Sequence, residues 1–411
     1  MPSFPQPDFT LPVGLARYRS TLLSWFDRSR RPLPWRSQRT LYGTWISEMM
    51  LQQTTVATVV PYWKKFLSAF PDVAALAAAD EVDVLALWSG LGYYRRARNL
   101  HAAANLVVDK FGGVLPQTRD QWLALPGVGP YASGAIASIG LGERVPALDA
   151  NARRVLTRWL VGHPDQCANL KASDLEAVGT DLVDPDRPGD WNEAVMELGA
   201  LVCGATNPGC GSCPVRSLCR AGTSGAADLI PPPQASPAVF QVRLGVLVVR
   251  CADQVLLTPP AGGYAAVPAG SGKPVRADLT GLHQGLWGLP STPWLPATAH
   301  NNTPWPAAFW RPWLENTLAH APSPVAWEPV LLGSFSHAVT RYRLKVVVYG
   351  LNLPDSGEIA REFLIPEISG PAASEGETGC LAPRFHLWPA GEMPVSRIVT
   401  KSLQLAAKHR V

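Results

Sequence analysis

The spacing of apolar residues differs between the two halves of the chain. In the N-terminal half, apolar positions recur every three or four residues, as in residues 81–113, where glycines interrupt the pattern at 90 and 92 and end it at 112 and 113. This period is typical of amphipathic helices, and glycine is typical of helix breaks and ends. We therefore expect an all-α domain over residues 1–225.

Residues 226–240 (AADLIPPPQASPAVF) interrupt the helical pattern. Three consecutive prolines cannot continue a helix, so we expect a linker here. Beyond it, apolar residues alternate or form short runs at 242–250, 254–259 and 343–351, a pattern that favours strands. The expected fold class is thus multidomain, an all-α domain followed by a mixed-sheet α/β domain over residues 241–411. Proline- and glycine-rich stretches between 259 and 324 indicate long loops.

Composition and charge limit the possible functions. Hydrophobic residues make up 47% of the chain, and the formal net charge of +4 permits a polyanionic partner without requiring one. Basic runs at 28–36 and 93–98 are compatible with a solvated face or with phosphate contacts. The sequence contains neither a secretory signal nor a long apolar span, so we expect a cytoplasmic monomer without membrane contact, at the nucleoid in a prokaryote.

Four of the seven cysteines lie close together: Cys203, Cys210, Cys213 and Cys219, spaced Cys-x6-Cys-x2-Cys-x5-Cys. In a reducing compartment, clustered cysteines favour a metal centre over disulfides. Four thiolates can bind zinc or a [4Fe–4S] cluster. Structural zinc sites commonly pair two close Cys-x2-Cys knuckles and only one occurs here, so the spacing favours the cluster.

The stretch LPGVGPYASG (125–134) places two glycines around Val128, between two helical patterns. Backbone N–H groups that converge in such a turn, next to a helix N-terminus, form a site suited to a phosphate. An ordinary corner between two helices is the alternative interpretation.

Two carboxylates are candidates for acid–base chemistry. Glu48 is expected near the start of a helix with apolar neighbours, where it could complement the helix dipole or, because burial raises the pKa of a carboxyl, act as a general acid. Asp149 precedes another helix and could cap it, stabilise a developing cation, or do both.

Together these stretches resemble the MutY family of adenine DNA glycosylases. The matching segments run in order across residues 32–219: PLPWR, WISEMMLQQTTVATVVPYW, WSGLGYYRRARNLH, LPGVGPYASGAI, LDANARRVL, NEAVMELGALVC and the cysteine spacing. The resemblance implies a helix–hairpin–helix fold with a [4Fe–4S] cluster. It also implies excision of adenine paired with 8-oxoguanine or guanine in duplex DNA, by base flipping and hydrolysis of the N-glycosidic bond.

The resemblance assigns roles to individual residues. Glu48 takes the place of the acid that protonates N7 of adenine, Asp149 that of the carboxylate that stabilises the sugar cation, and Tyr131 and Asn151 assist them. The residues implied in base or DNA binding are Arg31, Leu33, Trp35 and Arg36 around the pocket, Gln53 and Tyr93 at the orphaned 8-oxoguanine, and Thr54, Leu91, Arg95, Leu125, Gly127, Val128 and Gly129.

The C-terminal half resembles the Nudix-like domain of the same family at 282–291 (LHQGLWGLPS) and 330–350. A Nudix hydrolase needs clustered glutamates that bind magnesium, and no Asp or Glu occurs between Leu279 and Leu314, so we expect a reader of 8-oxoguanine rather than a nucleotide hydrolase. Phe335, Ser336 and His337 match a loop that contacts 8-oxoguanine; a plain hairpin turn is the alternative.

Two places in the sequence depart from the family pattern, and two other functions are possible. Ala150 stands where the family usually has glycine, and residues 204–209 (GATNPG) contain no Lys or Arg where relatives carry basic residues. An endonuclease III-like enzyme needs an amine nucleophile at the position of Tyr131, and no lysine occurs in 111–170. A non-catalytic helix–hairpin–helix DNA-binding protein is the other alternative, against which the presence of both Glu48 and Asp149 argues.

Overall fold

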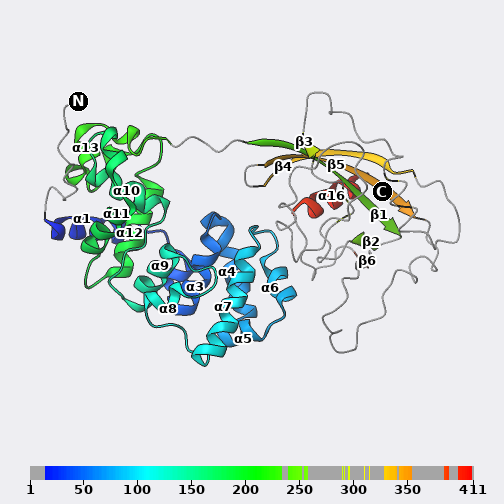
Figure 1. The fold of residues 1–411 in the computed structure, drawn as a ribbon, viewed down its shortest axis with the longest axis horizontal. Helices are drawn as coiled ribbons and strands as arrows, with labels where there is room; N and C mark the ends of the chain where they lie inside the picture. Colours follow the sequence, from blue (N-terminus) through cyan, green and yellow to red (C-terminus); the bar gives the residue numbers. More distant parts are fainter. Residues whose placement is uncertain are drawn as a thin grey trace. The chain divides into compact units, whose positions relative to one another are not determined.

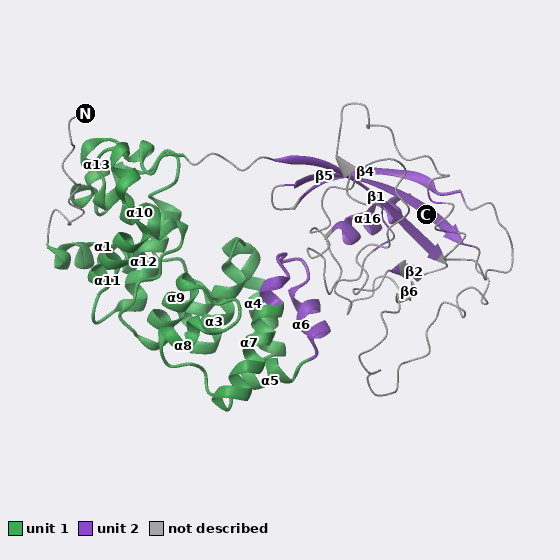
Figure 2. Ribbon diagram, viewed as in Figure 1, with its two compact units in different colours: residues 1–79, 98–235 green, residues 80–97, 236–411 purple. Residues whose placement is uncertain are grey.

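The computed structural model describes residues 14–233, 239–251, 254–257, 289, 291, 295–296, 310, 314, 328–339, 342–353, 384–387 and 397–409. The chain divides into two compact units, one of residues 1–79 and 98–235 and one of residues 80–97 and 236–411 (Figure 2). The sequence pattern does not predict that residues 80–97 group with the second unit. Within the described residues, no helix has both the length and the apolar character needed to cross a membrane.

Residues 14–230 are helical, in agreement with the predicted all-α half (Figure 1). The α-helices are α1 (Leu15–Ser29), α2 (Pro34–Ser37), α3 (Leu41–Leu51), α4 (Val56–Ala69), α5 (Val73–Ala78), α6 (Glu81–Trp88), α7 (Arg95–Phe111), α8 (Arg119–Leu123), α9 (Pro130–Leu141), α10 (Ala150–Leu160), α11 (Ala172–Leu182), α12 (Pro188–Leu201) and α13 (Arg220–Ser224). Short 3-10 turns are η1 (Pro164–Asn169), η2 (Cys210–Ser212), η3 (Arg216–Leu218) and η4 (Ala227–Leu229).

Polar side chains and glycines set the helix boundaries. The side chains of Thr40, Thr118 and Asp149 accept hydrogen bonds from the backbone N–H three residues on and so cap α3, α8 and α10. The predicted break at 90–92 separates α6 from α7, and Gly112 and Gly113 take positive φ after α7.

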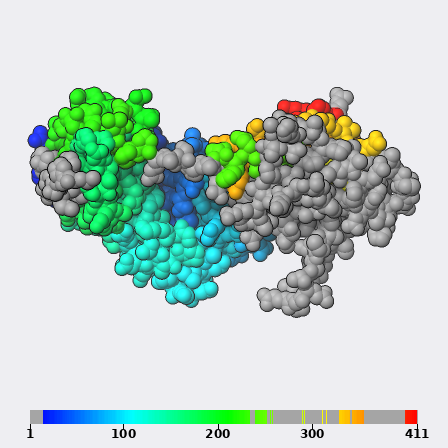
Figure 3. All heavy atoms as spheres, turned by 45° about the horizontal axis from the view of Figure 1, so that its top comes forward, coloured from blue at the N-terminus to red at the C-terminus, as the bar shows by residue number. Residues whose placement is uncertain are grey.

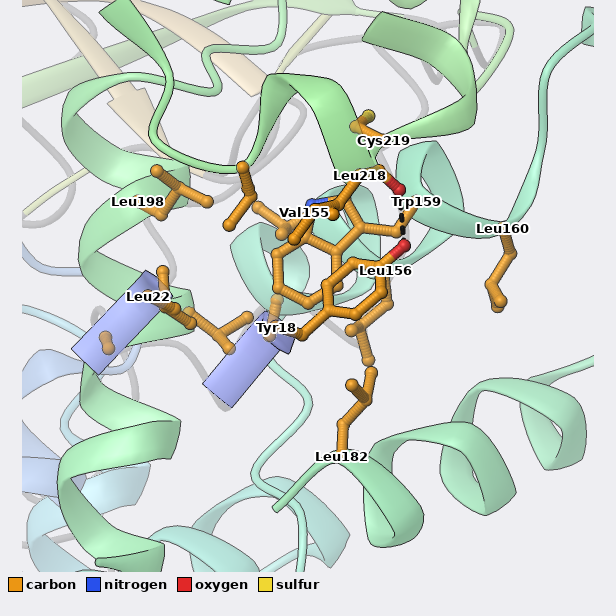
Figure 4. Close-up of a cluster of buried hydrophobic side chains, with 14 of the residues drawn as sticks. Tyr18, Leu22, Val155, Leu156, Trp159, Leu160, Leu182, Leu198, Leu218 and Cys219 are labelled. Atoms are coloured by element: carbon orange, nitrogen blue, oxygen red, sulfur yellow. Dashed lines mark hydrogen bonds between the residues drawn. The ribbon is translucent and has the colours of Figure 1, made fainter. Parts of the chain in front are cut away.

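One hydrophobic core joins α1 to α10, α11, α12 and the cysteine segment, and aromatic rings pack at its centre. The ring of Tyr18 on α1 packs against Trp159 on α10, with centroids 5.1 Å apart, and the Tyr18 hydroxyl donates to the carbonyl of Leu218 (Figure 4). Both side chains are fully buried, as is Leu22. In the space-filling view, blue atoms from the N-terminal part of the chain border green atoms of the later helices (Figure 3). The N-terminal helix is therefore fastened directly to the segment that carries the cysteines.

The predicted linker begins later than expected. Residues 227–229 form η4, and Ala227 and Ile230 are buried in the core of the helical unit. The carbonyl of Ile230 also accepts a hydrogen bond of 2.6 Å from the buried guanidinium of Arg158. Residues 234–238 of the predicted linker lie outside the described residues. The expected boundary at 225 is thus wrong by several residues, since 226–230 pack with the helices.

The second unit contains a mixed six-stranded sheet, as the change to strand-like patterns predicts. Its elements are β1 (Phe240–Cys251), β2 (Gln254–Leu257), β3 (Leu295–Pro296), β4 (Val330–Val339), β5 (Tyr342–Leu353), β6 (Arg384–Leu387) and the helix α16 (Arg397–Lys408). The strand order is β4-β5-β1-β2-β6, with β3 paired to β1; β1 and β5 are parallel and the other pairs antiparallel. Side chains of α16 such as Ile398 and Leu403 share a buried cluster with alternate residues of β1 and β5.

The segment Phe335–His337 lies within strand β4, not in a loop or hairpin turn as the sequence suggested. Its three residues pair with Val346, Lys345 and Leu344 of β5. Successive side chains of a strand point to opposite faces, so Ser336 lies on the face opposite to Phe335 and His337. Of residues 282–291 and the loops at 259–324, almost all lie outside the described residues.

Gly134 marks a close contact between α9 and the backbone before α10. A Cβ atom at this position would lie 2.2 Å from the carbonyl oxygen of Pro146. We therefore expect Gly134→Ala to lower the free energy of unfolding of the helical unit by about 1–3 kcal/mol, as overpacking does. Urea denaturation followed by helical circular dichroism measures this change.

Gly129→Ala is the matched control, because Gly129 caps the same helix at a φ of −92° and a Cβ there meets nothing within 4 Å. Alanine is a poorer N-cap than glycine, so this variant should lose about 0.5 kcal/mol, less than Gly134→Ala. Equal urea midpoints for the two variants would contradict the close packing.

Candidate active site

A cavity of about 710 Å³ in the helical unit brings together the predicted catalytic residues. Its walls come from the segment before α2, the end of α3 and the turn after it, the first turns of α9 and α10, and α12. The predicted residues that line it are Arg31, Leu33, Trp35, Arg36, Glu48, Gln53, Thr54, Tyr131, Asp149 and Asn151. Residues separated by more than a hundred positions in the sequence thus meet in one site.

Glu48 is a buried carboxyl at the floor of this cavity, with 5% of its surface exposed. It lies in the last turn of α3, not near the helix start as expected. A carboxylate at this negative end of the helix dipole is destabilised, so Glu48 does not complement the dipole. The hydroxyl of Tyr131 donates to Glu48 Oε2 at 2.6 Å. Burial raises the pKa of Glu48 to about 7, although the Tyr131 hydrogen bond acts in the opposite direction. Glu48 is therefore suited to donate a proton near neutral pH.

Asp149 caps α10, and this capping role is confirmed. Its Oδ1 accepts from the N–H of Ala152 at 2.6 Å, and its Oδ2 accepts from Asn151 Nδ2 at 3.1 Å. Burial raises the pKa of Asp149, and these hydrogen bonds to the ionised form counteract the effect. Ala150 is the first residue of α10 and so has helical backbone, which explains why alanine fits where glycine was expected.

Arg31 and Arg36 bind two glutamates of α12 that the sequence analysis missed. Glu197 accepts from Arg31 Nε at 2.8 Å and from Arg36 Nη2 at 3.2 Å, while Glu193 accepts from Arg36 Nε at 2.7 Å. Burial raises the pKa of Glu197, but the hydrogen bonds from Arg31 and Arg36 outweigh it and hold the pKa at about 2. The charge of Glu193 in turn helps to raise the pKa of Glu48.

Other lining residues were also missed, namely Leu51, Gln52, Thr55, Val56, Met196 and Ala200. A sequence feature that could have revealed the glutamates is their spacing of four within the apolar helix pattern NEAVMELG. Two carboxylates on one face of a helix that is otherwise buried require cationic partners.

The hairpin between α8 and α9 has the predicted helix–hairpin–helix form. Gly127 takes a φ of +77°, and a Cβ there would lie 2.6 Å from Cβ of Asn99, so the turn requires glycine. Leu125 and Val128 are buried, at 3% and 5% exposure. Their side chains belong to the core, so the hairpin can offer DNA its backbone but not these two side chains.

Leu91, Tyr93 and Arg95 do not line the cavity; they lie in the turn between α6 and α7 and at the start of α7. Leu91 is buried, whereas Tyr93 is 45% exposed and takes a φ of +51°. Gln53, on the cavity rim, also has a positive φ, of +58°. Two of the residues expected to probe a DNA base are therefore held in a backbone conformation that non-glycine residues seldom adopt.

The four clustered cysteines line a second cavity, next to Arg158 and Trp159. Arg158 Nη1 donates to Cys203 Sγ at 3.1 Å, and the N–H of Gly222 donates to Cys219 Sγ at 3.3 Å. Burial raises the pKa of Cys219 to about 12, and the neighbouring cysteines add to the effect. Within the described part of the chain, no three Cys, His, Asp or Glu side chains are positioned as a ready set of metal ligands.

Arg154 forms hydrogen bonds both to the cysteine segment and to a residue that lines the first cavity. Its Nε donates to the carbonyl of Cys203 at 2.9 Å, and its Nη2 donates to Asn151 Oδ1 at 2.9 Å. Asn151 in turn donates to Asp149, so these hydrogen bonds run from a cysteine carbonyl to the carboxylate.

Comparison with known proteins identifies the family. Residues 46–177 match the HhH-GPD superfamily of base excision DNA repair proteins. The chain is 35% identical over 377 residues to the adenine DNA glycosylase of Rattus norvegicus, covering 83% of this chain and 71% of that protein. It is 38% identical over 320 residues to the adenine DNA glycosylase of Homo sapiens, covering 68% of this chain and 58% of that protein.

Among solved structures, a thermostable thymine-DNA glycosylase matches with a TM-score of 0.48 and 28% identity, over 51% of this chain and 96% of that one. The extent and identity of the sequence matches, together with the HhH-GPD segment, establish that this chain belongs to the adenine DNA glycosylase family.

Proposed function

We propose that this chain is a monofunctional DNA glycosylase that excises adenine paired with 8-oxoguanine or guanine in duplex DNA. The observation that carries the proposal is the buried Glu48, whose pKa burial raises to about 7, in one cavity with Tyr131 and Asp149. Adenine in a duplex is out of reach of such a cavity, so the nucleotide has to leave the base stack first.

The reaction follows from the two carboxyl groups. Glu48 donates its proton to N7 of the flipped adenine, and the C1′–N9 bond then breaks with its electron pair passing to the neutral leaving base. The sugar becomes cationic, and the carboxylate of Asp149, oriented by Ala152 and Asn151, stabilises this charge. Water adds to C1′ and gives its proton to a carboxylate of the cavity, leaving an abasic site.

The alternatives are less compatible with this cavity. A bifunctional enzyme of the endonuclease III kind needs an amine nucleophile, and the described lining residues include no lysine; Tyr131 stands at that point. A non-catalytic DNA-binding module has no need for a buried carboxyl with a raised pKa. Burying such a group lowers the stability of the fold, and groups of this kind cluster at functional sites.

We also propose that Cys203, Cys210, Cys213 and Cys219 hold a [4Fe–4S] cluster. The chemistry of the residues fits this group, because four cysteines line one cavity and two of their sulfurs receive N–H hydrogen bonds, as thiolate ligands do, while the described side chains are not already arranged as a set of ligands. Burial raises the pKa of Cys213 and of Cys219, and the charges of the neighbouring cysteines add to the effect; a bound metal centre would favour the thiolate form of these side chains. When bound, the cluster supplies a structural cross-link; it takes no part in the proposed hydrolysis.

For the second unit we propose a Nudix-like fold that reads 8-oxoguanine rather than hydrolysing nucleotides. The mixed sheet with α16 on one face is compatible with this proposal, and Ser336 on β4 is exposed. Ser336 pairs with Lys345 across the β4–β5 ladder, so a hydroxyl and a cation lie side by side on that face.

The role of Glu48 as the acid is tested by Glu48→Gln. Removing a general acid should lower the single-turnover rate of adenine excision from an A:8-oxoguanine duplex by about 10²- to 10⁴-fold, with affinity for the duplex retained. Glu81→Gln, a carboxyl in the first turn of α6 that does not line the cavity, is the control and should excise normally. Unchanged excision by the Glu48 variant would refute the assignment.

The pKa of Glu48 predicts the pH dependence. Only the protonated Glu48 is active, so the excision rate should fall about tenfold per pH unit well above pH about 7. At acidic pH the rate should fall again, because the mechanism needs Asp149 in its ionised form and burial raises the pKa of Asp149. Because the Tyr131 hydrogen bond lowers the pKa of Glu48, Tyr131→Phe should move this alkaline fall to higher pH, whatever its effect on the maximal rate. Single-turnover rates against pH measure both.

Tyr42→Phe is the matched control, since the Tyr42 hydroxyl donates to the carbonyl of Phe70 and Tyr42 does not line the cavity. Its alkaline fall should coincide with that of the unaltered protein. A shift to lower pH in Tyr131→Phe would be the wrong sign and would remove Glu48 as the titrating group.

The cluster proposal predicts a brown protein with about four iron and four sulfide per chain. Cys213→Ser should lose most of the iron, whereas Cys167→Ser should keep it, because Cys167 does not line the cysteine cavity. Metal and sulfide analysis decides the matter. A colourless protein with one zinc and no sulfide would contradict the proposal.

A further inference from the structure

The turn between α6 and α7 presents an aromatic side chain on a strained backbone. Gly90, Gly92 and Tyr93 all have positive φ, at 97°, 76° and 51°. Glycine adopts such angles at no steric cost, but a non-glycine residue pays about 1–3 kcal/mol for a sparsely populated backbone region. Tyr93 nevertheless occupies this position and leaves 45% of its surface exposed.

A buried arginine holds this turn from beneath. Arg96 is 7% exposed, and its guanidinium lies 5.3 Å from the ring centroid of Trp88 and 5.6 Å from that of Tyr93. Its Nη2 donates to the carbonyl of Gly92 at 3.0 Å, which also accepts from Trp88 Nε1 at 3.2 Å. The Arg96 N–H donates to the carbonyl of Tyr93 at 2.9 Å. The cation thus contacts the ring of Tyr93 and fixes the peptide unit that precedes it.

Two unfavourable features therefore occur in one short turn. A tyrosine has a positive φ, and a guanidinium is buried deeply enough that burial lowers the pKa of Arg96 to about 10. Neither is needed to connect two helices, since a glycine at position 93 would relieve the first and a neutral side chain at 96 the second. Strain that the surroundings maintain is a mark of a functional segment.

We infer that Arg96 is a positioning residue: it orders the ring of Tyr93, which the family resemblance places at the orphaned base, and holds it outward before DNA binds, ready to enter a base step. Aromatic rings that enter a base stack open it at a cost of a few kcal/mol, and a ring that is already ordered loses less entropy on insertion. The guanidinium supplies this order through cation–π contact and the Gly92 carbonyl. The use as a DNA wedge rests on the proposed function; the ordering of Tyr93 by Arg96 does not.

The neighbouring Arg95 has a different part in the same segment. It is exposed at the start of α7, where a cation can meet a phosphate of any sequence. Arg95 and Arg96 are chemically identical and adjacent, so exchanging each for methionine compares a surface cation with a buried one.

A double-mutant cycle tests the inference. Arg96→Met should weaken binding to a duplex with a non-excisable 2′-fluoro-adenosine opposite 8-oxoguanine by about tenfold, with little effect on a fully paired duplex. In a Tyr93→Ala background, Arg96→Met should cause no further loss, because the residue acts through the ring. Arg96→Lys, which keeps the cation, should recover part of the affinity. Arg95→Met should weaken binding to both duplexes, additively with Tyr93→Ala.

Equal losses from Arg96→Met with and without the Tyr93 ring would overturn the inference, since they would mean that Arg96 only supports the fold. A second measurement needs no DNA: ¹⁹F NMR of protein containing 3-fluorotyrosine, with the Tyr93 signal assigned by its loss in Tyr93→Phe. The Tyr93 resonance should be shifted in the unaltered protein and move to the value of an unstructured tyrosine in Arg96→Met. A resonance that does not move in Arg96→Met also overturns the inference. If the resonance moves in Arg96→Met but the unaltered protein excises no adenine, only the proposed function is refuted.

Discussion

The burial of one carboxyl group, that of Glu48, is the constraint on which the helical unit's cavity depends. A carboxyl without water holds its proton near neutral pH, and that property makes it an acid. The guanidinium of Arg36 is also poorly solvated, and it pairs with the buried Glu193 and Glu197 of α12; the partly exposed Arg31 pairs with Glu197 as well. The ion pairs thus follow from the apolar surroundings that the acid needs, and they tie α12 to the segment before α3.

The two functional groups of the helical unit share supporting residues. Tyr18 of α1 contacts Trp159 and the carbonyl of Leu218, so the N-terminal helix, α10 and the cysteine segment pack as one core. Asp149 caps the N-terminus of α10, and the last turn of this helix carries Arg158, whose guanidinium donates to the carbonyls of Gly204 and Ile230. One helix therefore orients a cavity carboxylate at one end and the cysteine segment at the other.

Local patterns predicted the helices and the change to strands, because spacing, caps and glycines act over a few residues, whereas the resemblance to the MutY family supplied most of the cavity residues. Other features depend on distant partners and could not be read this way. Glu193 and Glu197 acquire their role from Arg31 and Arg36, far away in the sequence. Glu48 lies in the last turn of α3 and not at a helix start, because Thr40 caps that helix well before it, and Phe335–His337 is a strand because it pairs with β5, a distant segment for a local pattern.

The buried side chains of the hairpin have a consequence for how such a protein finds its target. Leu125 and Val128 belong to the core and Gly127 has no side chain, so at these three positions the turn can present only peptide groups to a duplex. Peptide N–H groups recognise phosphates, which are the same at every step of DNA, and not the edges of bases. A hairpin of this kind holds all sequences alike, which permits one-dimensional diffusion along the duplex until a damaged pair is met.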